Sequence, residues 1–304
     1  MSVQTSLEKV CRSWLDDNLY HFQLDPSWDS ALFFQNLKPY GELVLLAALT
    51  KNTRQASFAR HQKLLAGWLT RHQPGAADVA GIVREFPQAL PWMGLIWQNL
   101  ERAGVPAPGY KEALKKLVAS KSILYFERHA GHDICVHHLI ERLGRVSPYN
   151  LDELYDRTML GREAWDRPSD TAIYYICHDI FFLTNWGQVN LTGSVKPGRE
   201  WTTKLLHWQR TCVAQHNIDL AAELSIALSF LRRKPGRSIH EGRGDTTLND
   251  VGLPAPPAGQ GEGFISAGDS EDRIRFFQNY HTVIVCLIAL ACQPGWIVAW
   301  HARR

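Results

Sequence analysis

The sequence YYICHDIFFLTNWG, residues 174–187, is almost wholly apolar, yet it holds a cysteine, a histidine and an aspartate in succession. It shows none of the alternation of apolar and polar residues that marks a half-buried strand. Residues 171–185 are therefore expected to form a helix. A helix that is apolar nearly all round must be surrounded by other elements. The stretch thus predicts an inner helix of a large helical assembly.

The same helical period recurs along the chain. Near the N-terminus, Val10, Trp14 and Leu15 fall on one apolar stripe. Turns rich in proline and glycine, such as AGVPAPGY (103–110), separate the periodic segments. Further helices are expected at roughly 57–72, 91–103, 110–128, 132–144, 198–215, 217–232, 272–292 and 295–302. Because no segment alternates as a strand does, we predict an all-α protein.

The arrangement of these helices is predicted from their short connections. Helical hairpins joined by short turns can close into an α/α toroid or stay open as a solenoid. No repeat of fixed period is present, which favours the toroid. We expect one helical domain over residues 1–304, with the open solenoid as the alternative. Residues 233–271 are rich in glycine, proline and polar residues and are expected to form a long loop, either a lid or a disordered segment.

The composition is that of an ordinary globular protein, with 45% hydrophobic and 21% charged residues among 304. The formal charge is +3, and the basic residues are spread along the chain. Nucleic-acid binding needs a basic stripe, so no nucleic-acid partner is expected. Eleven tryptophans are many for this length and suggest an interior or a cavity lined by aromatic side chains.

The sequence gives no reason to expect a membrane or an export pathway. Residues 1–22 contain no basic segment followed by an apolar run. The six cysteines are far apart and form no CxxC pair, so reduced thiols are expected. The longest apolar run, 282–300, is interrupted at Pro294, and each half is too short to span a bilayer. We expect a soluble, cytoplasmic protein.

Three stretches together resemble an uncharacterised family of bacterial proteins associated with natural-product gene clusters. They are residues 14–49, 174–187 and 260–291. The central motif of that family is similar to THxxFYLTDFG, and this chain has CHDIFFLTNWG at 177–187. The resemblance implies an α/α toroid and an enzyme of specialised metabolism, but no particular reaction. Asn185 stands where the motif has an aspartate, which weakens any role that depends on a carboxylate there.

His178 and Asp179 are the first candidate catalytic residues. Adjacent residues of a helix point about 100° apart, so the two cannot face one centre. A buried carboxylate needs a hydrogen bond or an ion pair, and a histidine or arginine of another helix would supply it. Such a pair orients a base or a metal ligand in many enzymes, and it also neutralises an aspartate within a core. Both interpretations remain open.

Tyr280 and His281 are the second pair of candidate catalytic residues. They lie near the start of a very apolar helix, directly after the long loop. Concave pockets between bundled helices are common binding sites, and a toroid would place its site at the mouth of its inner helices. The alternative is a helix start capped by neighbouring polar groups.

Thirteen histidines are present. Four of them lie close together: His129, His132, His137 and His138. Only residues three or four apart share a helical face, so at most two of the four could bind one metal. We predict His132, His178 and His281 as metal ligands. Two or three histidines with a carboxylate suit Fe, Zn or Cu.

Two functions follow from these observations. The first is an enzyme of bacterial specialised metabolism that acts in an aromatic-lined central cavity on a small molecule or on a carrier- or peptide-tethered substrate. Its chemistry would be metal-dependent, or acid–base chemistry of a histidine–carboxylate pair. The second is a non-catalytic helical protein that binds a ligand or a carrier-tethered intermediate. Convergence of His178, Asp179 and His281 in one pocket would favour the enzyme.

Overall fold

The computed structural model describes residues 3–24, 30–51, 53, 55–162, 168–191, 199–232 and 270–292. Every regular element in these ranges is a helix, and none of them is a strand, which confirms the all-α prediction. The loop predicted at 233–271 lies outside the described residues except for Ser270 and Glu271, and so does the helix predicted at 295–302.

The α-helices are α1 (Val3–Asn18), α2 (Ser30–Thr50), α3 (Ala56–His72), α4 (Ala76–Glu85), α5 (Leu90–Ala103), α6 (Tyr110–Leu117), α7 (Lys121–Leu124), α8 (Ala130–Arg142), α9 (Leu151–Asp156), α10 (Asp170–Leu183), α11 (Arg199–Ala214), α12 (Ile218–Arg232) and α13 (Glu271–Cys292). Two short 3-10 helices, η1 (Leu19–Phe22) and η2 (Pro87–Ala89), complete the set. The helix predicted over 110–128 is divided into α6 and α7, because the backbone at Ser120 is extended, with φ −84° and ψ 113°.

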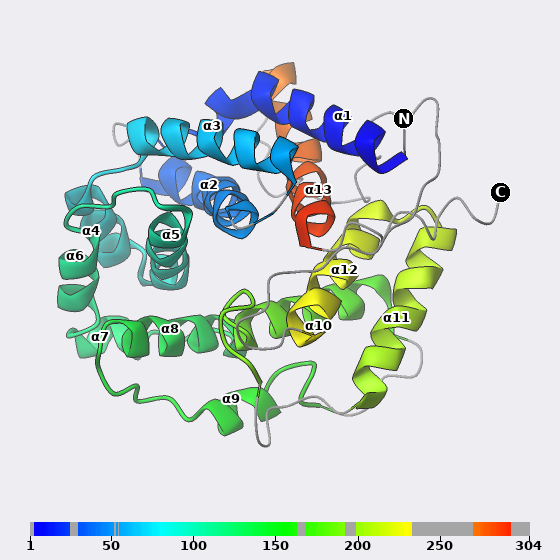
Figure 1. Ribbon diagram of the computed structural model, residues 1–304. Helices are drawn as coiled ribbons and strands as arrows, with labels where there is room; N and C mark the ends of the chain where they lie inside the picture. The colour runs from blue at the N-terminus through cyan, green and yellow to red at the C-terminus, as the bar shows by residue number, and fades with distance from the viewer. Residues whose placement is uncertain are drawn as a thin grey trace.

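Six helices contact one another in a closed circuit (Figure 1). α2 packs on α5, α5 on α8, α8 on α10, α10 on α12 and α12 on α13, and α13 packs back on α2. Other helices lie against this circuit from outside, α1 against α13, α3 against α2 and α11 against α12. A complete α/α toroid, with an outer helix behind each inner one, remains a prediction.

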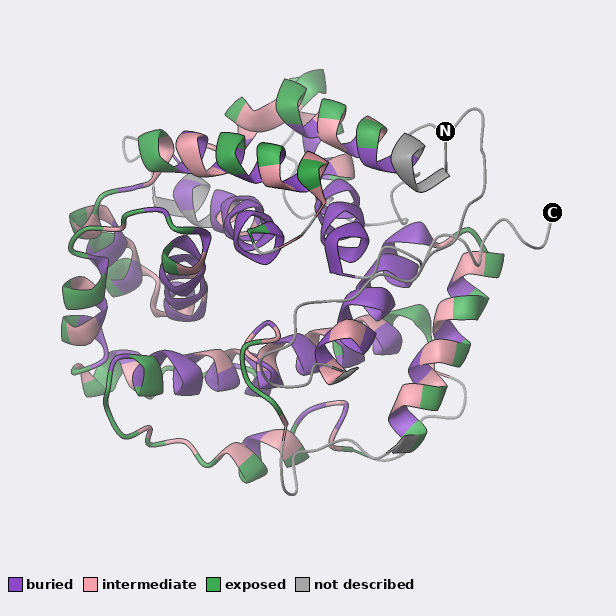
Figure 2. Ribbon diagram, viewed as in Figure 1, coloured by how far each residue is buried: buried purple, intermediate pink, exposed green. Residues whose placement is uncertain are grey.

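The helices of the circuit are the buried ones (Figure 2). In α13 every residue from Tyr280 to Cys292 is buried. α3 and α11 instead alternate between buried and exposed positions, as helices with one solvent face do. Each large apolar side chain removed from water contributes about 1.5–3 kcal/mol, so the circuit is the main source of stability.

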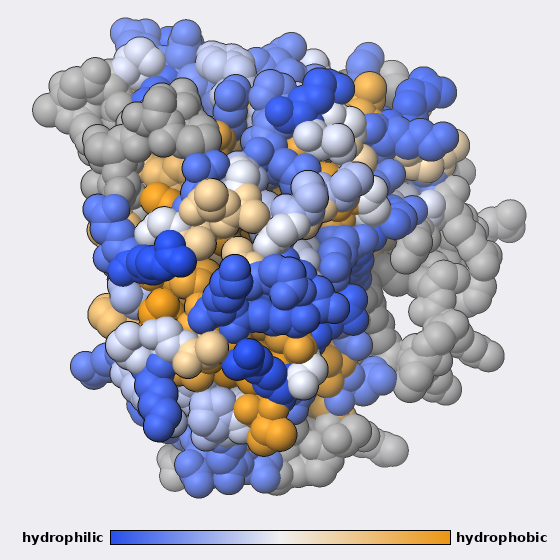
Figure 3. Space-filling model, turned by 90° about the vertical axis from the view of Figure 1, so that its left-hand side faces the viewer, coloured by the Kyte–Doolittle hydropathy of each residue, from blue (hydrophilic) through white to orange (hydrophobic). Residues whose placement is uncertain are grey.

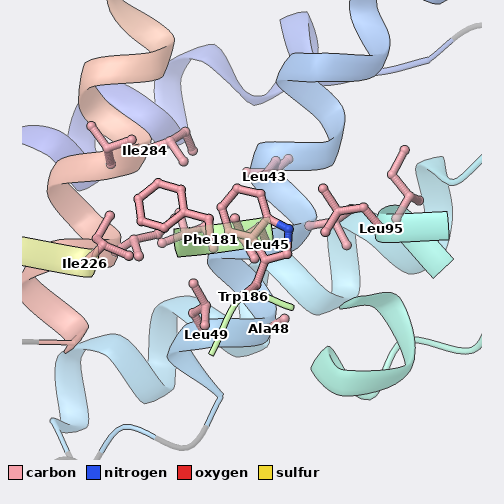
Figure 4. Close-up of a cluster of buried hydrophobic side chains, with 14 of the residues drawn as sticks. Leu43, Leu45, Ala48, Leu49, Leu95, Phe181, Trp186, Ile226 and Ile284 are labelled. Atoms are coloured by element: carbon pink, nitrogen blue, oxygen red, sulfur yellow. The ribbon is translucent and has the colours of Figure 1, made fainter. Parts of the chain in front are cut away.

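Apolar side chains fill part of the space inside the circuit (Figure 4). Phe181 and Trp186, which stack with their ring centroids 5.1 Å apart, lie among leucines of α2. Leu95 of α5, Ile226 of α12 and Ile284 of α13 complete the cluster. On α2, α12 and α13 the ionisable residues described below precede these apolar residues in sequence, so polar and apolar layers follow one another along the same helices.

Glycines allow α8 to lie close to its neighbours. A Cβ atom at Gly131 would lie 2.5 Å from Cδ2 of Phe182 on α10. A Cβ atom at Gly94 on α5 would lie 2.8 Å from Cδ2 of Leu139 on α8. Real Cβ contacts are longer than this, so a larger residue would separate the helices or displace the ring.

The turn after α10 has an unusual backbone. Asn185, Trp186 and Gly187 have φ values of 44°, 55° and 73°, a left-handed conformation that costs energy for the two residues with side chains. The Asn185 amide donates to Oε1 of Gln98 at 3.0 Å, and Arg102 donates to the Trp186 carbonyl at 3.1 Å. Asn185 is therefore a link between α10 and α5.

The outer helix α6 shows how the surface is built. Tyr110, Leu114 and Leu117 are buried, whereas Lys111 and Glu112 are exposed. The face of the molecule toward α4 and α6 carries mostly hydrophilic side chains, with hydrophobic ones between them (Figure 3).

Among the described residues, only α13 is long and apolar enough to cross a membrane by length and composition, and 78% of its apolar window is buried inside the protein. A buried core helix passes the same test of length and composition.

Candidate functional site

Four helices of the circuit bring ionisable side chains together inside the apolar core. α13 contributes His281, α2 contributes Glu42, α12 contributes Asp219 and Glu223, and α10 contributes His178. The first four are buried, Glu223 completely, and the His178 side chain is 17% exposed. Charged side chains are almost never fully buried unless they are paired, so this cluster needs a specific explanation.

His281 is at the centre of the cluster. Its Nδ1 lies 3.0 Å from Oε2 of Glu42, and its Nε2 lies 3.1 Å from Oε1 of Glu223 and 3.9 Å from Oδ2 of Asp219. Burial alone would lower the pKa of His281, but the Glu42 and Asp219 carboxylates and the hydrogen bond to Glu223 raise it to about 10. Without a metal, His281 is therefore a buried imidazolium that donates from both nitrogens.

Glu42 and Asp219 each interact with a second side chain besides His281. Burial alone would raise the pKa of Glu42, but His281 and Lys38, whose Nζ lies 3.7 Å from Oε1, lower it below its ordinary value. The hydroxyl of Thr282 donates to Oδ1 of Asp219 at 2.8 Å. Asp219 also lies in the first turn of α12, where the helix dipole favours a negative charge.

Glu223 connects the two histidines. Its Oε1 faces His281, and its Oε2 lies 3.5 Å from Nδ1 of His178. Burial raises the pKa of Glu223 to about 7 despite the opposing effect of His281. Glu223 therefore gains or loses a proton near neutral pH.

His178 is neutral and has a defined tautomer. Its Nδ1 lies 3.0 Å from the carbonyl oxygen of Tyr174, and a carbonyl only accepts, so Nδ1 carries the hydrogen. Burial lowers the pKa of His178 to about 3. The lone pair of Nε2 is thus left to act as a base or as a metal ligand.

The structure separates the other two predicted catalytic residues from this cluster. Oδ2 of Asp179 accepts a hydrogen bond from the backbone nitrogen of Leu160 at 3.0 Å, and burial raises its pKa to about 6. The Tyr280 ring stacks on Phe276 and meets the edge of Phe22, toward η1. His178 and His281 share Glu223, whereas the Asp179 carboxylate faces the chain after α9.

His132, the third predicted metal ligand, lies at the start of α8. Its ring centroid is 3.7 Å from that of His129, as the spacing of three residues predicts, and 6.1 Å from that of Phe182. Burial lowers its pKa to about 3. Phe182 in turn lies 5.8 Å from His178, so an aromatic ring separates His132 from the cluster.

A second group of metal-ligating residues lies farther along α8. Ligand atoms of His137, His138 and Glu141 all lie within 4.8 Å of one another. All three come from one helix, Glu141 is exposed, and Nε2 of His138 faces the Leu183 carbonyl at 3.3 Å. These features make it a weaker metal site than the buried cluster.

Sequence reasoning missed the three carboxylates. Each is a charged residue inside an apolar run, Glu42 in YGELVLLAAL (40–49) and the other two in IDLAAELSIALSF (218–230). Asp219 and Glu223 are four residues apart and share one helical face. Charged residues are rarely buried unless they are paired, so a charged residue within an apolar helical run is the feature that could have predicted these carboxylates.

The formal charges of the cluster are balanced by a divalent cation once His281 is neutral. Asp219, Glu223 and His281 each present one ligand atom, and these atoms lie within 4.8 Å of one another. With Glu42 there are three carboxylates, and Lys38 is the cation paired with them at 3.7 Å among the described residues. With His281 protonated, as in the metal-free protein, at most one negative charge remains. When His281 loses its Nε2 proton on binding a metal ion, two negative charges remain, and one divalent ion balances them.

The fold and this cluster define an all-helical protein with a buried carboxylate–histidine centre. The chain belongs to the family described as a domain of unknown function (DUF6895), which matches residues 9–291. This family is uncharacterised, as the resemblance implied, but the match carries no information on natural-product clusters or on the central motif. No curated protein and no solved structure matches the chain.

Proposed function

We propose that this protein is a metal-dependent enzyme whose ion is held by Asp219, Glu223 and His281. The observation that carries the proposal is the convergence of their ligand atoms within 4.8 Å in an apolar core. Burying carboxylates costs several kcal/mol for each ion unless opposite charge is close. A bound cation supplies that charge and becomes the largest local charge of the site.

The neighbours of the three ligands fit this role. Metal-bound histidines usually donate their other ring N–H to a carboxylate, which fixes the ring and raises its basicity. Glu42 stands in this position, 3.0 Å from Nδ1 of His281. The Thr282 hydroxyl orients the Asp219 carboxylate by donating a hydrogen bond to it. His178, whose Nδ1 faces Tyr174 and Glu223, has Nε2 left to act as a base toward the substrate.

The donor set narrows the choice of metal. Of the Fe, Zn and Cu expected from the sequence, Fe(II) and Zn(II) suit two carboxylates and one imidazole, and Mn(II) suits them as well. Such an ion polarises a substrate oxygen or activates bound water near neutral pH.

Acid–base catalysis without a metal is the second candidate. It is favoured by the pKa of Glu223, about 7, and by the neutral His178 that lies 3.5 Å from it. A group that titrates near the working pH transfers protons efficiently.

The cellular role is proposed on the sequence and the resemblance alone. We place the enzyme in bacterial specialised metabolism, in the cytoplasm, with a small-molecule or a carrier- or peptide-tethered substrate and no nucleic-acid or membrane partner. The alternative is a non-catalytic protein that binds a ligand or a carrier-tethered intermediate. Substrate-dependent turnover by the purified protein separates the two.

The proposal is tested by the metal content of the purified protein. We expect elemental mass spectrometry to find about one Fe, Mn or Zn per chain in protein prepared without chelators. Chelator treatment should remove the metal and lower the midpoint of thermal unfolding, and adding back the metal should restore it, because a ligand that binds the folded state stabilises it. Protein that retains no metal after anaerobic incubation with each of the three ions would contradict the proposal.

A further inference from the structure

We infer that the substrate carries a planar aromatic ring with an oxygen substituent, and that the ring lies against a row of partly exposed aromatic side chains beside the metal ligands. The row consists of Tyr174, His178, Phe182, His132 and Trp92. This inference rests on the proposed function, because it names the substrate class of the same site.

One stripe of α10 forms the first half of the row. Tyr174, His178 and Phe182 are four residues apart and lie on one helical face, and all three are partly exposed. Cys177 and Phe181, on one side of this stripe, are buried, whereas Tyr175 on the other side is exposed. The stripe thus remains accessible to a ligand although its helix belongs to the inner circuit.

Two neighbouring helices extend the row. Trp92 is the partly exposed residue in the otherwise buried run 89–100 of α5, and His132 is flanked by buried residues on α8. The ring centroids follow one another without a gap: Trp92 to His132 6.4 Å, His132 to Phe182 6.1 Å, Phe182 to His178 5.8 Å, and His178 to Tyr174 4.0 Å. Three helices thus offer one continuous aromatic surface.

The Tyr174 end of the row lies beside the candidate metal site, and the other end packs on α2. The Tyr174 ring centroid is 6.4 Å from that of His281. At the other end, a Cβ atom at Gly41, the residue before Glu42, would lie 3.3 Å from Cε3 of Trp92. A ring held against the row would therefore have its substituents within reach of the ion.

The chemistry of the row selects a flat aromatic ring, because all five of its side chains are themselves flat rings in contact with one another. Aromatic faces and edges bind another aromatic ring by stacked or edge contacts, which contribute about 0.5–1.5 kcal/mol beyond the area buried. Lys38, whose side chain is 26% exposed, adds an ammonium group beside the carboxylates for an oxygen anion of the substituent.

The inference is tested with two probes that share one carbon skeleton. Naphthalene-2-carboxylate is planar and aromatic, whereas decahydronaphthalene-2-carboxylate is saturated and not flat. We expect calorimetric titration of metal-loaded wild-type protein to show naphthalene-2-carboxylate binding at least about tenfold more tightly, as two or more stacked contacts would give. Equal affinities, or tighter binding of the saturated probe, would overturn the inference.

Variants show which side chains cause the preference for the aromatic probe. Phe182→Leu and Trp92→Leu each remove a ring of the row, and each is expected to cancel most of the tenfold preference. Tyr125→Leu is the control, because Tyr125 is an aromatic residue outside the row, directly after α7, and is 68% exposed. If both row variants fold, as judged by circular dichroism, and keep the wild-type preference, the row is not the binding surface. If only one of the two variants folds, its preference between the two probes is the test of the row.

The two proposals fail in different ways. The titrations are repeated on chelator-treated protein, in which the aromatic row is intact. A protein that takes up no metal yet prefers the aromatic probe contradicts the proposed metal centre and retains the aromatic site. A metal-loaded protein with no such preference contradicts the substrate class alone.

Discussion

Replacing Glu223 by glutamine is expected to abolish metal binding while the protein remains folded. Glutamine has the shape of a protonated glutamic acid, and burial, which raises the pKa of Glu223, favours an uncharged side chain at this position. The amide removes one of three ligands and one negative charge, so metal affinity should fall about 100-fold or more. Metal per chain after dialysis against a metal buffer, together with urea unfolding, measures both effects.

The matched control is Asp179→Asn. Asp179 is also a buried carboxyl group, on α10, but its oxygen accepts from Leu160 rather than facing His281. We expect this variant to keep the metal content of the wild type. Retention of metal by Glu223→Gln, or its loss from folded Asp179→Asn, would show that the ligand set is wrong.

The largest expected loss of stability comes from Arg128→Met. Arg128 is buried, and its guanidinium donates to four backbone carbonyls, those of Pro87, Ile123, Leu124 and Phe126. Methionine has a similar length but no donor, so these carbonyls lose charge-assisted hydrogen bonds. We expect the free energy of unfolding in urea to fall by about 2–4 kcal/mol, since hydrogen bonds to charged groups contribute about 1.5–3 kcal/mol each and are not additive.

An exposed arginine provides the comparison. The Arg275 side chain is 71% exposed and pairs with Glu271 one helical turn away, at 3.2 Å. Exposed pairs of this kind contribute little, so Arg275→Met should change the free energy of unfolding by no more than about 0.5 kcal/mol. If the two variants lose the same stability, the buried guanidinium does not have the role assigned to it.

Much of the helical architecture could be predicted from the sequence. The nearly all-apolar character of residues 171–185 and 280–292 predicted inner helices, and α10 and α13, which contain these residues, both belong to the closed circuit. Local breaks were harder, because a short irregularity such as that at Ser120 carries no proline or glycine. The α/α toroid stays a prediction, because the pattern of apolar residues does not determine how the outer helices pair.

The candidate site could be predicted only in part. His178 and His281 attracted attention because they are polar residues in apolar helices, and the structure places both beside Glu223. Asp179 was expected with them, but a helix turns about 100° per residue and its carboxylate faces Leu160 instead. Glu42 is 239 residues from His281, and only the packing of α2 on α13 brings them together.

The central claim is tested most directly by locating the metal in a crystal of the wild-type protein. Anomalous diffraction at the absorption edge of the bound metal should give one strong peak about 2.0–2.3 Å from Nε2 of His281 and from carboxylate oxygens of Asp219 and Glu223. A fully loaded crystal with its peak at His137, His138 and Glu141 instead, or with no peak beside His281, would contradict the account.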